Sequence, residues 1–215
     1  MNIAILLYER FTALDAIGPY EVLSRLPGAS VAFLAAQPGP VRTDNGCLTV
    51  LAEHSLQDMP QPDVVLVPGG PGDVAEHAGP AALDWLREAH RTSTWTTSVC
   101  TGSLILAAAG LLDGRRATSH WLAMEELRRL GAQPVSERVV FDGKVVTAAG
   151  VSAGIDMALA LAARIAGDTV AQAIQLGIEY DPQPPFDAGS PRKAPAEVVE
   201  LVRSRSPRVQ EEVAR

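Results

Sequence analysis

The sequence is poor in cysteine, in histidine and in positive charge, and each shortage argues against a class of protein. Cys47 and Cys100 are the only cysteines in 215 residues. Two are too few for a disulfide framework, so the expected compartment is a reducing cytoplasm. Lys and Arg number 18 against 25 Asp and Glu, a formal net charge of −7. A nucleic-acid surface would need a basic face, so no nucleic-acid partner is expected. The four scattered histidines show no zinc-ligand spacing, so no metal site is expected.

Long apolar runs are also missing. No stretch approaches the roughly 18 residues that a membrane span needs, so no membrane partner is expected. The chain runs from Met1-Asn2 directly into an apolar segment without a basic region or a cleavage site, which argues against a secretory signal. Hydrophobic residues make up 47% of the sequence, enough to bury a sizeable core. The length favours one large α/β domain.

Strand-like and helix-like segments alternate from the N-terminus to Tyr180. The predicted strands are residues 3–8, 31–36, 64–67, 94–99 and 117–119, with hairpins around Asn45-Gly46 (residues 41–51) and Asp142-Gly143 (residues 135–148). The predicted helices are residues 12–26, 80–90, 102–109, 121–130, 152–166 and 169–180. This alternation predicts an α/β fold with a largely parallel sheet and helices on both faces.

The segment from Asp181 onward has a different composition. Five prolines in residues 181–195 are too many for a helix or a sheet, so this segment is expected to run extended. A polar helix is predicted to follow from Pro195. We therefore expect an α/β domain over residues 1–180, and an arm over residues 181–215 that packs on the same domain or on a partner subunit.

Cys100 is the most informative residue. It lies where the threonine-rich strand ends and a helix of small residues begins at Gly102. A sharp strand-to-helix turn holds such a side chain out of the sheet, and the helix N-terminus favours the thiolate, the form that attacks electrophiles. The alternative is that Cys100 is a small buried hydrophobic residue at the end of a core strand.

Two further segments, the loop after the strand at residues 3–8 and the loop at residues 68–72, are expected at the same edge of the sheet, because parallel strands bind ligands at their carboxyl ends. Gly69 and Gly70 follow a buried strand, and their N–H groups could form an oxyanion hole with the N–H of Thr101. The alternative is a tight turn that merely needs glycine. Thr101 could hydrogen-bond a ligand or only cap the following helix.

Asp15 is a candidate functional carboxylate. With Thr12 it could form a capping box, which is a purely structural role. Gly18-Pro19 follows inside the predicted helix, where proline removes a hydrogen bond to the Asp15 carbonyl at a cost of about 3 kcal/mol. Local rules are often broken at functional sites, so the functional and the structural interpretation both stay open.

A cysteine nucleophile usually works with a base, and histidine is the commonest one. His120 could approach the elbow in space, although a structural role is as well founded. The other histidines lie in polar surroundings and are expected at the surface, and Cys47 is expected to be a packing residue.

Several of these motifs together resemble the ThiJ/PfpI superfamily, and within it the isocyanide hydratases. The motifs are residues 8–22 with Asp15-x-x-Gly-Pro, the Val-Pro-Gly-Gly loop, Val-Cys100-Thr-Gly-Ser, Ala-Thr-Ser-His120-Trp, and Pro-Pro-Phe-Asp-Ala-Gly-Ser-Pro at 184–191. The resemblance implies a flavodoxin-like sandwich of the class I glutamine amidotransferase-like type, and a homodimer. It also implies a nucleophile at Cys100, a carboxylate partner at Asp15 and a ligand contact at Thr101.

The sequence also departs from some relatives. Peptidase-like members of the superfamily carry histidine after the cysteine, where this chain has Thr101, so peptidase activity is not expected. Many stress-protective members carry glutamate where Asp15 stands. In related transcription regulators a helix-turn-helix domain follows; with this sequence ending at Arg215, no such domain is expected.

The resemblance predicts the hydration of an isocyanide to an N-substituted formamide through a thioimidate on Cys100, with water as co-substrate and no metal or organic cofactor. Two alternatives use the same cysteine. One is a glyoxalase or deglycase acting on α-oxoaldehydes with His120 as proton carrier. The other is a non-enzymatic sensor in which Cys100 is oxidised.

Overall fold

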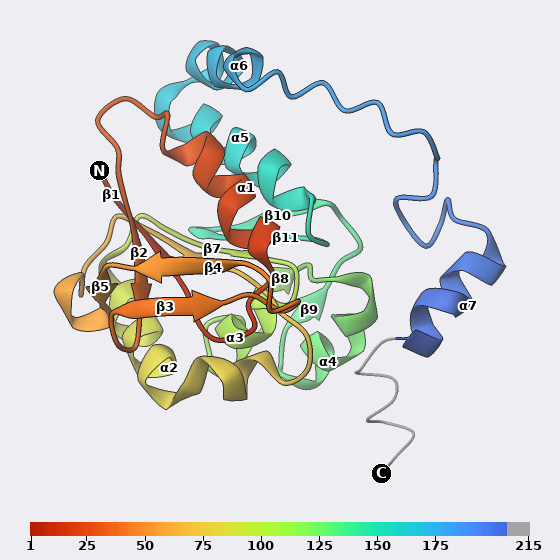
Figure 1. The fold of residues 1–215 in the computed structure, drawn as a ribbon, viewed down its shortest axis with the longest axis horizontal. Coiled ribbons are helices and arrows are strands. Elements are labelled where there is room, and N and C mark those ends of the chain that lie inside the picture. Colours follow the sequence, from red (N-terminus) through yellow and green to blue (C-terminus); the bar gives the residue numbers. More distant parts are fainter. Residues whose placement is uncertain (206–215) are drawn as a thin grey trace.

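A seven-stranded sheet forms the centre of the molecule in the computed structural model, which describes residues 1–205 (Figure 1). From edge to edge its strands are β10 (Val139–Asp142), β11 (Val145–Ala148), β7 (Trp95–Val99), β6 (Val64–Val67), β1 (Asn2–Leu6), β2 (Ser30–Ala35) and β5 (His54–Ser55). All neighbours pair in parallel except β10 and β11, which pair antiparallel. The predicted, largely parallel sheet is therefore confirmed.

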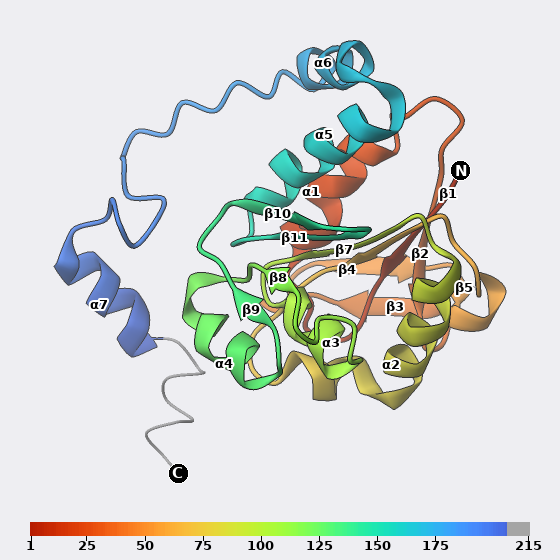
Figure 2. The same cartoon turned by 180° about the vertical axis from the view of Figure 1, so that it is seen from behind.

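Helices cover both faces of this sheet (Figures 1 and 2). One side carries α1 (Ala13–Leu23), α5 (Ala153–Ala166) and α6 (Asp168–Gly177), and the other carries α2 (Val74–Thr92), α3 (Gly102–Ala108) and α4 (Met124–Arg129). Short 3₁₀ turns, η1 (Leu56–Asp58) and η2 (Trp121–Ala123), lie in the connections. The apolar faces of α1, α5 and α6 pack together around Leu23, Leu161 and Ile174.

The two central strands are buried by different means. β6 consists of four buried apolar residues, as a strand covered on both faces requires. β7 is rich in threonine, and both of its threonine side chains are buried with a partner: the Thr97 hydroxyl donates to the Val65 carbonyl over 2.8 Å, and the Thr96 hydroxyl lies 2.8 Å from the His90 ring. The buried Ser98 hydroxyl has no hydrogen-bond partner among the described residues. A strand of threonines can therefore occupy the middle of the sheet.

The predicted hairpins differ in detail from the observed ones. β3 (Gly39–Arg42) and β4 (Thr49–Ala52) pair antiparallel, but a six-residue loop joins them instead of a tight turn at Asn45-Gly46. The Asp142-Gly143 hairpin is confirmed between β10 and β11, although its first strand begins only at Val139. Just before residue 135, where the hairpin was predicted to begin, lies β9 (Gln133–Pro134). It pairs in parallel with β8 (Arg116–Ala117).

The helix predicted from Pro80 begins earlier, at Val74, and contains a break. Asp73 caps it by accepting a hydrogen bond from the N–H of Glu76 over 3.1 Å. Gly79 then adopts φ +78°, which a helix does not allow, so Pro80 begins a second helical piece. The prediction missed residues 74–78 because a glycine followed by a proline, here Gly79-Pro80, is typical of the start of a helix.

The arm leaves α6 as an extended segment and carries α7 (Ala196–Arg205) to one side of the domain (Figures 1 and 2). α7 confirms the helix predicted after Pro195, but none of its residues is buried. The last part of the predicted arm, residues 206–215, lies outside the described residues. Within residues 1–205 no helix is both long and apolar enough to cross a membrane.

Candidate active site

The site lies at the carboxyl edge of four neighbouring strands, β11, β7, β6 and β1. Cys100 follows β7, Gly69 and Gly70 follow β6, and the loop after β1 leads into α1 with Asp15. Because parallel strands end at the same edge, these segments meet although they are far apart in the sequence. The expected convergence of the three segments is confirmed.

Cys100 forms a strained elbow between β7 and α3. Its φ is +58°, a conformation that costs a side-chain-bearing residue about 1–2 kcal/mol. The backbone is held in place by hydrogen bonds: the Cys100 N–H donates to the carbonyls of Ala148 (3.1 Å) and Ala149 (2.8 Å), and its carbonyl accepts from the Ser103 and Ser119 hydroxyls. The side chain is only 6% exposed, so a substrate must reach it through a cavity.

Asp15 is fully buried in α1 next to this elbow. Its Oδ2 accepts a hydrogen bond from the Gly69 N–H over 2.9 Å, and its Oδ1 has no hydrogen-bond partner among the described residues. Burial raises the pKa of Asp15 to about 7, while the Gly69 N–H and the Cys100 side chain oppose the rise and the charge of Asp44 adds to it. At neutral pH the carboxyl group therefore carries a proton for a substantial part of the time, next to a sulfur nucleophile.

The structural alternative for Asp15, a capping box with Thr12, is wrong. Thr12 is the N-cap of α1, but its side chain makes no capping hydrogen bond. Its hydroxyl instead donates to Asp44 Oδ2 over 2.8 Å, and the Asp15 carboxylate faces Gly69. Pro19 does lie inside the helix, as the sequence indicated.

Thr101 holds the glycine loop in place. Its hydroxyl donates to the Gly70 carbonyl over 2.7 Å and accepts from the Gly70 N–H over 2.9 Å. The N–H groups of Gly69 and Gly70, which the sequence suggested for an oxyanion hole, donate to Asp15 Oδ2 and to the Thr101 hydroxyl in this structure. A Cβ at Gly69 would lie 2.6 Å from the Thr101 backbone nitrogen, so glycine is required here for close packing.

Sequence reasoning missed Asp44. It lies in the β3–β4 loop, and its two carboxylate oxygens accept from the Thr12 hydroxyl and the Asn45 N–H, each over 2.8 Å. The segment Asp44-Asn45-Gly46 was a turn signal in the sequence, and nothing in that signal indicated an active-site role. The structure places Asp44 on the wall of the same cavity as Cys100.

A cavity of about 410 Å³ leads to Cys100. Its inner part is formed by side chains and backbone of the elbow and the neighbouring loops: Thr12, Asp44, Gly70, Cys100 and Thr101. Its outer part includes His120, Val151 and three residues of α7, which are Leu201, Val202 and Arg205. The arm therefore contributes to the wall of the site.

His120 is on the cavity wall, as the sequence allowed. Its Nδ1 accepts a hydrogen bond from the Leu122 N–H over 3.4 Å, and its ring lies beside Trp121. A Cβ at Gly150 would approach the His120 ring to 3.2 Å, so Gly150 leaves room for the imidazole. These contacts fix the position of the ring on the wall of the cavity that contains Cys100.

The remaining cysteine and histidines differ from the predictions in part. Cys47 is exposed, so its interpretation as a packing residue is wrong; the long β3–β4 loop leaves it in solvent. His54 is exposed as expected, but His77 and His90 are half-buried. Within residues 1–205 no cluster of three or more His, Cys, Asp or Glu side chains could hold a metal ion.

A mostly parallel α/β sandwich with a buried cysteine at a strained strand-to-helix elbow defines the class of this protein: a flavodoxin-like fold of the class I glutamine amidotransferase-like type with a nucleophile elbow. Within this class the chain belongs to the DJ-1/PfpI family, whose sequence pattern matches residues 1–164.

Three relatives place the chain more closely. It is 44% identical to an isonitrile hydratase from Pseudomonas putida, over 96% of this chain and 90% of that enzyme. It is 34% identical to the HTH-type transcriptional regulator CdhR from Pseudomonas aeruginosa, over 73% of this chain and 47% of the regulator. The crystal structure of a ThiJ/PfpI family protein from Pseudomonas syringae superimposes with a TM-score of 0.90 at 39% identity, covering 94% of this chain and 86% of that one.

Proposed function

We propose that this protein hydrates isocyanides to N-substituted formamides, with Cys100 as nucleophile and Asp15 as proton donor and acceptor. The observation that carries the proposal is the pairing of a buried carboxyl group, whose pKa is raised to about 7, with a strained elbow cysteine. The isonitrile hydratase from Pseudomonas putida, 44% identical over nearly the whole chain, supports the choice of substrate.

The first step joins sulfur to carbon. The terminal carbon of an isocyanide is electrophilic, and the Cys100 thiolate attacks it while the Asp15 carboxyl group gives its proton to that carbon. A C–S and a C–H bond form, and the product is a neutral thioimidate on Cys100 with Asp15 now a carboxylate. A carboxyl group with a pKa near the working pH is suited to this transfer.

The second step adds water. The water oxygen attacks the thioimidate carbon while the Asp15 carboxylate takes a proton from that water. Asp15 then passes this proton to the thioimidate nitrogen. The tetrahedral intermediate then collapses: the C–S bond breaks, the hydroxyl proton returns to Asp15, and the formamide leaves. Cys100 is again a thiolate and Asp15 again a carboxylic acid, so the cycle closes without a cofactor.

Thr101 is proposed to contact the ligand through its backbone N–H. It lines the cavity next to Cys100, and its hydroxyl hydrogen is already donated to Gly70. In this proposal Gly69 and Gly70 act by orienting Asp15 and Thr101 instead of binding the developing charge themselves.

The expected surroundings of the enzyme are also proposals. We propose a homodimer, supported by apolar side chains of the arm that face solvent, such as Phe186 at 78% exposure. We propose a cytoplasmic location, supported by the two cysteines, which do not form a disulfide. Light scattering of the purified protein and fractionation of the source cells test these two statements.

The decisive experiment mixes purified protein with para-tolyl isocyanide and measures formamide by chromatography. Wild-type turnover is expected, while Cys100→Ser and Asp15→Ala should each lower it by at least about a thousandfold. Cys47→Ser is the matched control for a cysteine replacement, because Cys47 is exposed and outside the site, and it should keep full activity.

Mass spectrometry during turnover should detect the thioimidate on Cys100. Absence of turnover by folded wild-type protein would refute the proposal. Methylglyoxal with His120→Ala, and oxidation of Cys100 by peroxide, would then test activity on α-oxoaldehydes and the sensor function. A loss of activity in Cys47→Ser equal to that in Cys100→Ser would refute the assigned nucleophile.

A further inference from the structure

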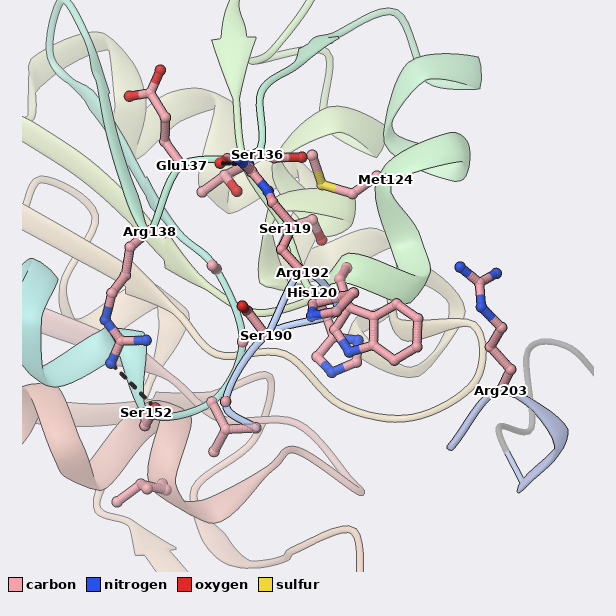
Figure 3. A pocket seen from close by; sticks show the side chains of 18 residues that line it. Ser119, His120, Met124, Ser136, Glu137, Arg138, Ser152, Ser190, Arg192 and Arg203 are labelled. Atoms are coloured by element: carbon pink, nitrogen blue, oxygen red, sulfur yellow. Dashed lines mark hydrogen bonds between the residues drawn. The ribbon is translucent and has the colours of Figure 1, made fainter. Parts of the chain in front are cut away.

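A second and larger cavity, of about 680 Å³, lies between the domain and the arm (Figure 3). His120 and Val151 line both this cavity and the one that contains Cys100. The two cavities are therefore neighbours that share part of their walls. Leu14 and Met124 add apolar wall there, which suits a hydrocarbon group.

The side chains that line the second cavity carry more positive than negative charge. Arg138 forms an ion pair with Asp156 and donates to the Ser152 hydroxyl, and Glu137 pairs with Arg116 over 2.8 Å. These four charged groups are thus neutralised by partners.

Two guanidinium groups remain, Arg192 and Arg203, both carried by the arm. Arg192 donates to the Ser136 carbonyl over 3.0 Å, and Arg203 lies over the Trp121 ring at 5.1 Å. Neither has a carboxylate partner within residues 1–205. In a protein of net charge −7, one cavity is thus lined by two cations that have no carboxylate partner in the described part of the chain. Arginine side chains are well suited to bind a carboxylate.

We propose that the second cavity, next to the one that contains Cys100, takes the anionic end of the substrate, so that the preferred isocyanide carries a carboxylate on its hydrocarbon group. The positive charges of Arg192 and Arg203, on opposite sides of His120, attract this carboxylate (Figure 3). This inference rests on the proposed function for the reactive end of the molecule. It also assigns a role to the arm: the domain supplies Cys100 and Asp15, and the arm selects which isocyanide reaches them.

Binding of unreactive product analogues tests the cavity without turnover. Titration calorimetry compares para-formamidobenzoate with N-(para-tolyl)formamide, which has the same ring and lacks the charge. Wild type should bind the carboxylate at least about tenfold more tightly, and Arg192→Gln and Arg203→Gln should each remove most of this preference. Arg91→Gln, an exposed arginine of α2 outside both cavities, is the control and should change nothing.

Kinetics with para-isocyanobenzoate and para-tolyl isocyanide then test selection. The arginine variants should raise the KM of the first and leave kcat/KM of the second unchanged. Equal binding of the two formamides by wild type would overturn the inference, as would a preference that survives the double variant. These outcomes differ from failure of the proposed function, which is absence of turnover of the neutral isocyanide.

Discussion

The inner and outer parts of the candidate site are built in opposite ways. Cys100, Asp15 and Thr101 are each at most 6% exposed, and each is fixed by hydrogen bonds to backbone of another segment. Leu201 and Val202 on α7 are 48% and 43% exposed and belong to a helix without a buried residue. The comparison teaches that the reactive groups depend on the packed core, whereas the outer wall can change without disturbing the fold.

The largest expected effect on stability concerns Asp15. Its folded-state pKa of about 7 lies above the ordinary value of 3.8, so the folded protein holds the proton more tightly than the unfolded chain. Stability from this group is full below pH 3.8 and is lost as the pH rises towards 7. Between pH 5 and pH 8 the free energy of unfolding should fall by about 3 kcal/mol because of Asp15.

Denaturant unfolding of wild type and Asp15→Asn at both pH values measures this contribution. The variant should lose that pH-dependent fall, and Asp113→Asn, which replaces an exposed carboxylate, should keep it. An unchanged pH dependence in Asp15→Asn would show that Asp15 is ionised throughout, and the inner site would then lose its proton donor.

Gly69 tests how tightly the inner site is packed. Gly69→Ala would bring a Cβ to 2.6 Å from both the backbone nitrogen and the hydroxyl of Thr101. We expect a loss of about 1–3 kcal/mol in the free energy of unfolding, together with a loss of turnover, because Asp15 and Thr101 must shift. Gly177→Ala, at the end of α6 with no atom within 4 Å, is the control and should be neutral or slightly stabilising. Equal effects of the two substitutions would contradict the packing argument.

Asp44 allows a smaller and more selective change. Asp44→Asn keeps the shape that accepts the Thr12 hydroxyl but removes the charge that raises the pKa of Asp15. The pKa of Asp15 should fall, so the decline of kcat/KM with rising pH should move to lower pH, and only slightly, because Asp44 is the smallest of the causes that shift this pKa. The pH–rate profile measures this shift, with Asp84→Asn on the exposed side of α2 as control. A profile that does not move would show that Asp44 is only structural.

The smallest effect is expected in the outer wall. Leu201→Ala should change the KM of a bulky isocyanide about two- to threefold and the free energy of unfolding by less than about 0.5 kcal/mol, because the side chain is half exposed. Val198→Ala on the same helix, which lines neither cavity, is the matched control. A large loss of stability in Leu201→Ala would break the distinction between inner and outer site.

Most of the sheet could be predicted because its signals are local. The run Val64–Val67 matches the observed strand at both ends, and the Asp142-Gly143 turn was recognised from two residues. The long β3–β4 loop and the early start of α2 could not be predicted, because side-chain hydrogen bonds and caps decide where a segment stops.

The sequence by itself determined the alternating elements, the elbow at Cys100 and the candidates Asp15, Thr101 and His120. These could be predicted because hydrophobic periodicity and residues with special roles are local signals that lie within one segment. Only the tertiary structure decided that Asp15 bonds to the Gly69 N–H, that Asp44 joins the cavity wall, and that Cys47 lies in solvent. The physical reason is that these properties depend on contacts between segments more than 25 residues apart along the chain. Such contacts bury a carboxyl group and so set its pKa, and they provide the acceptor for a glycine N–H.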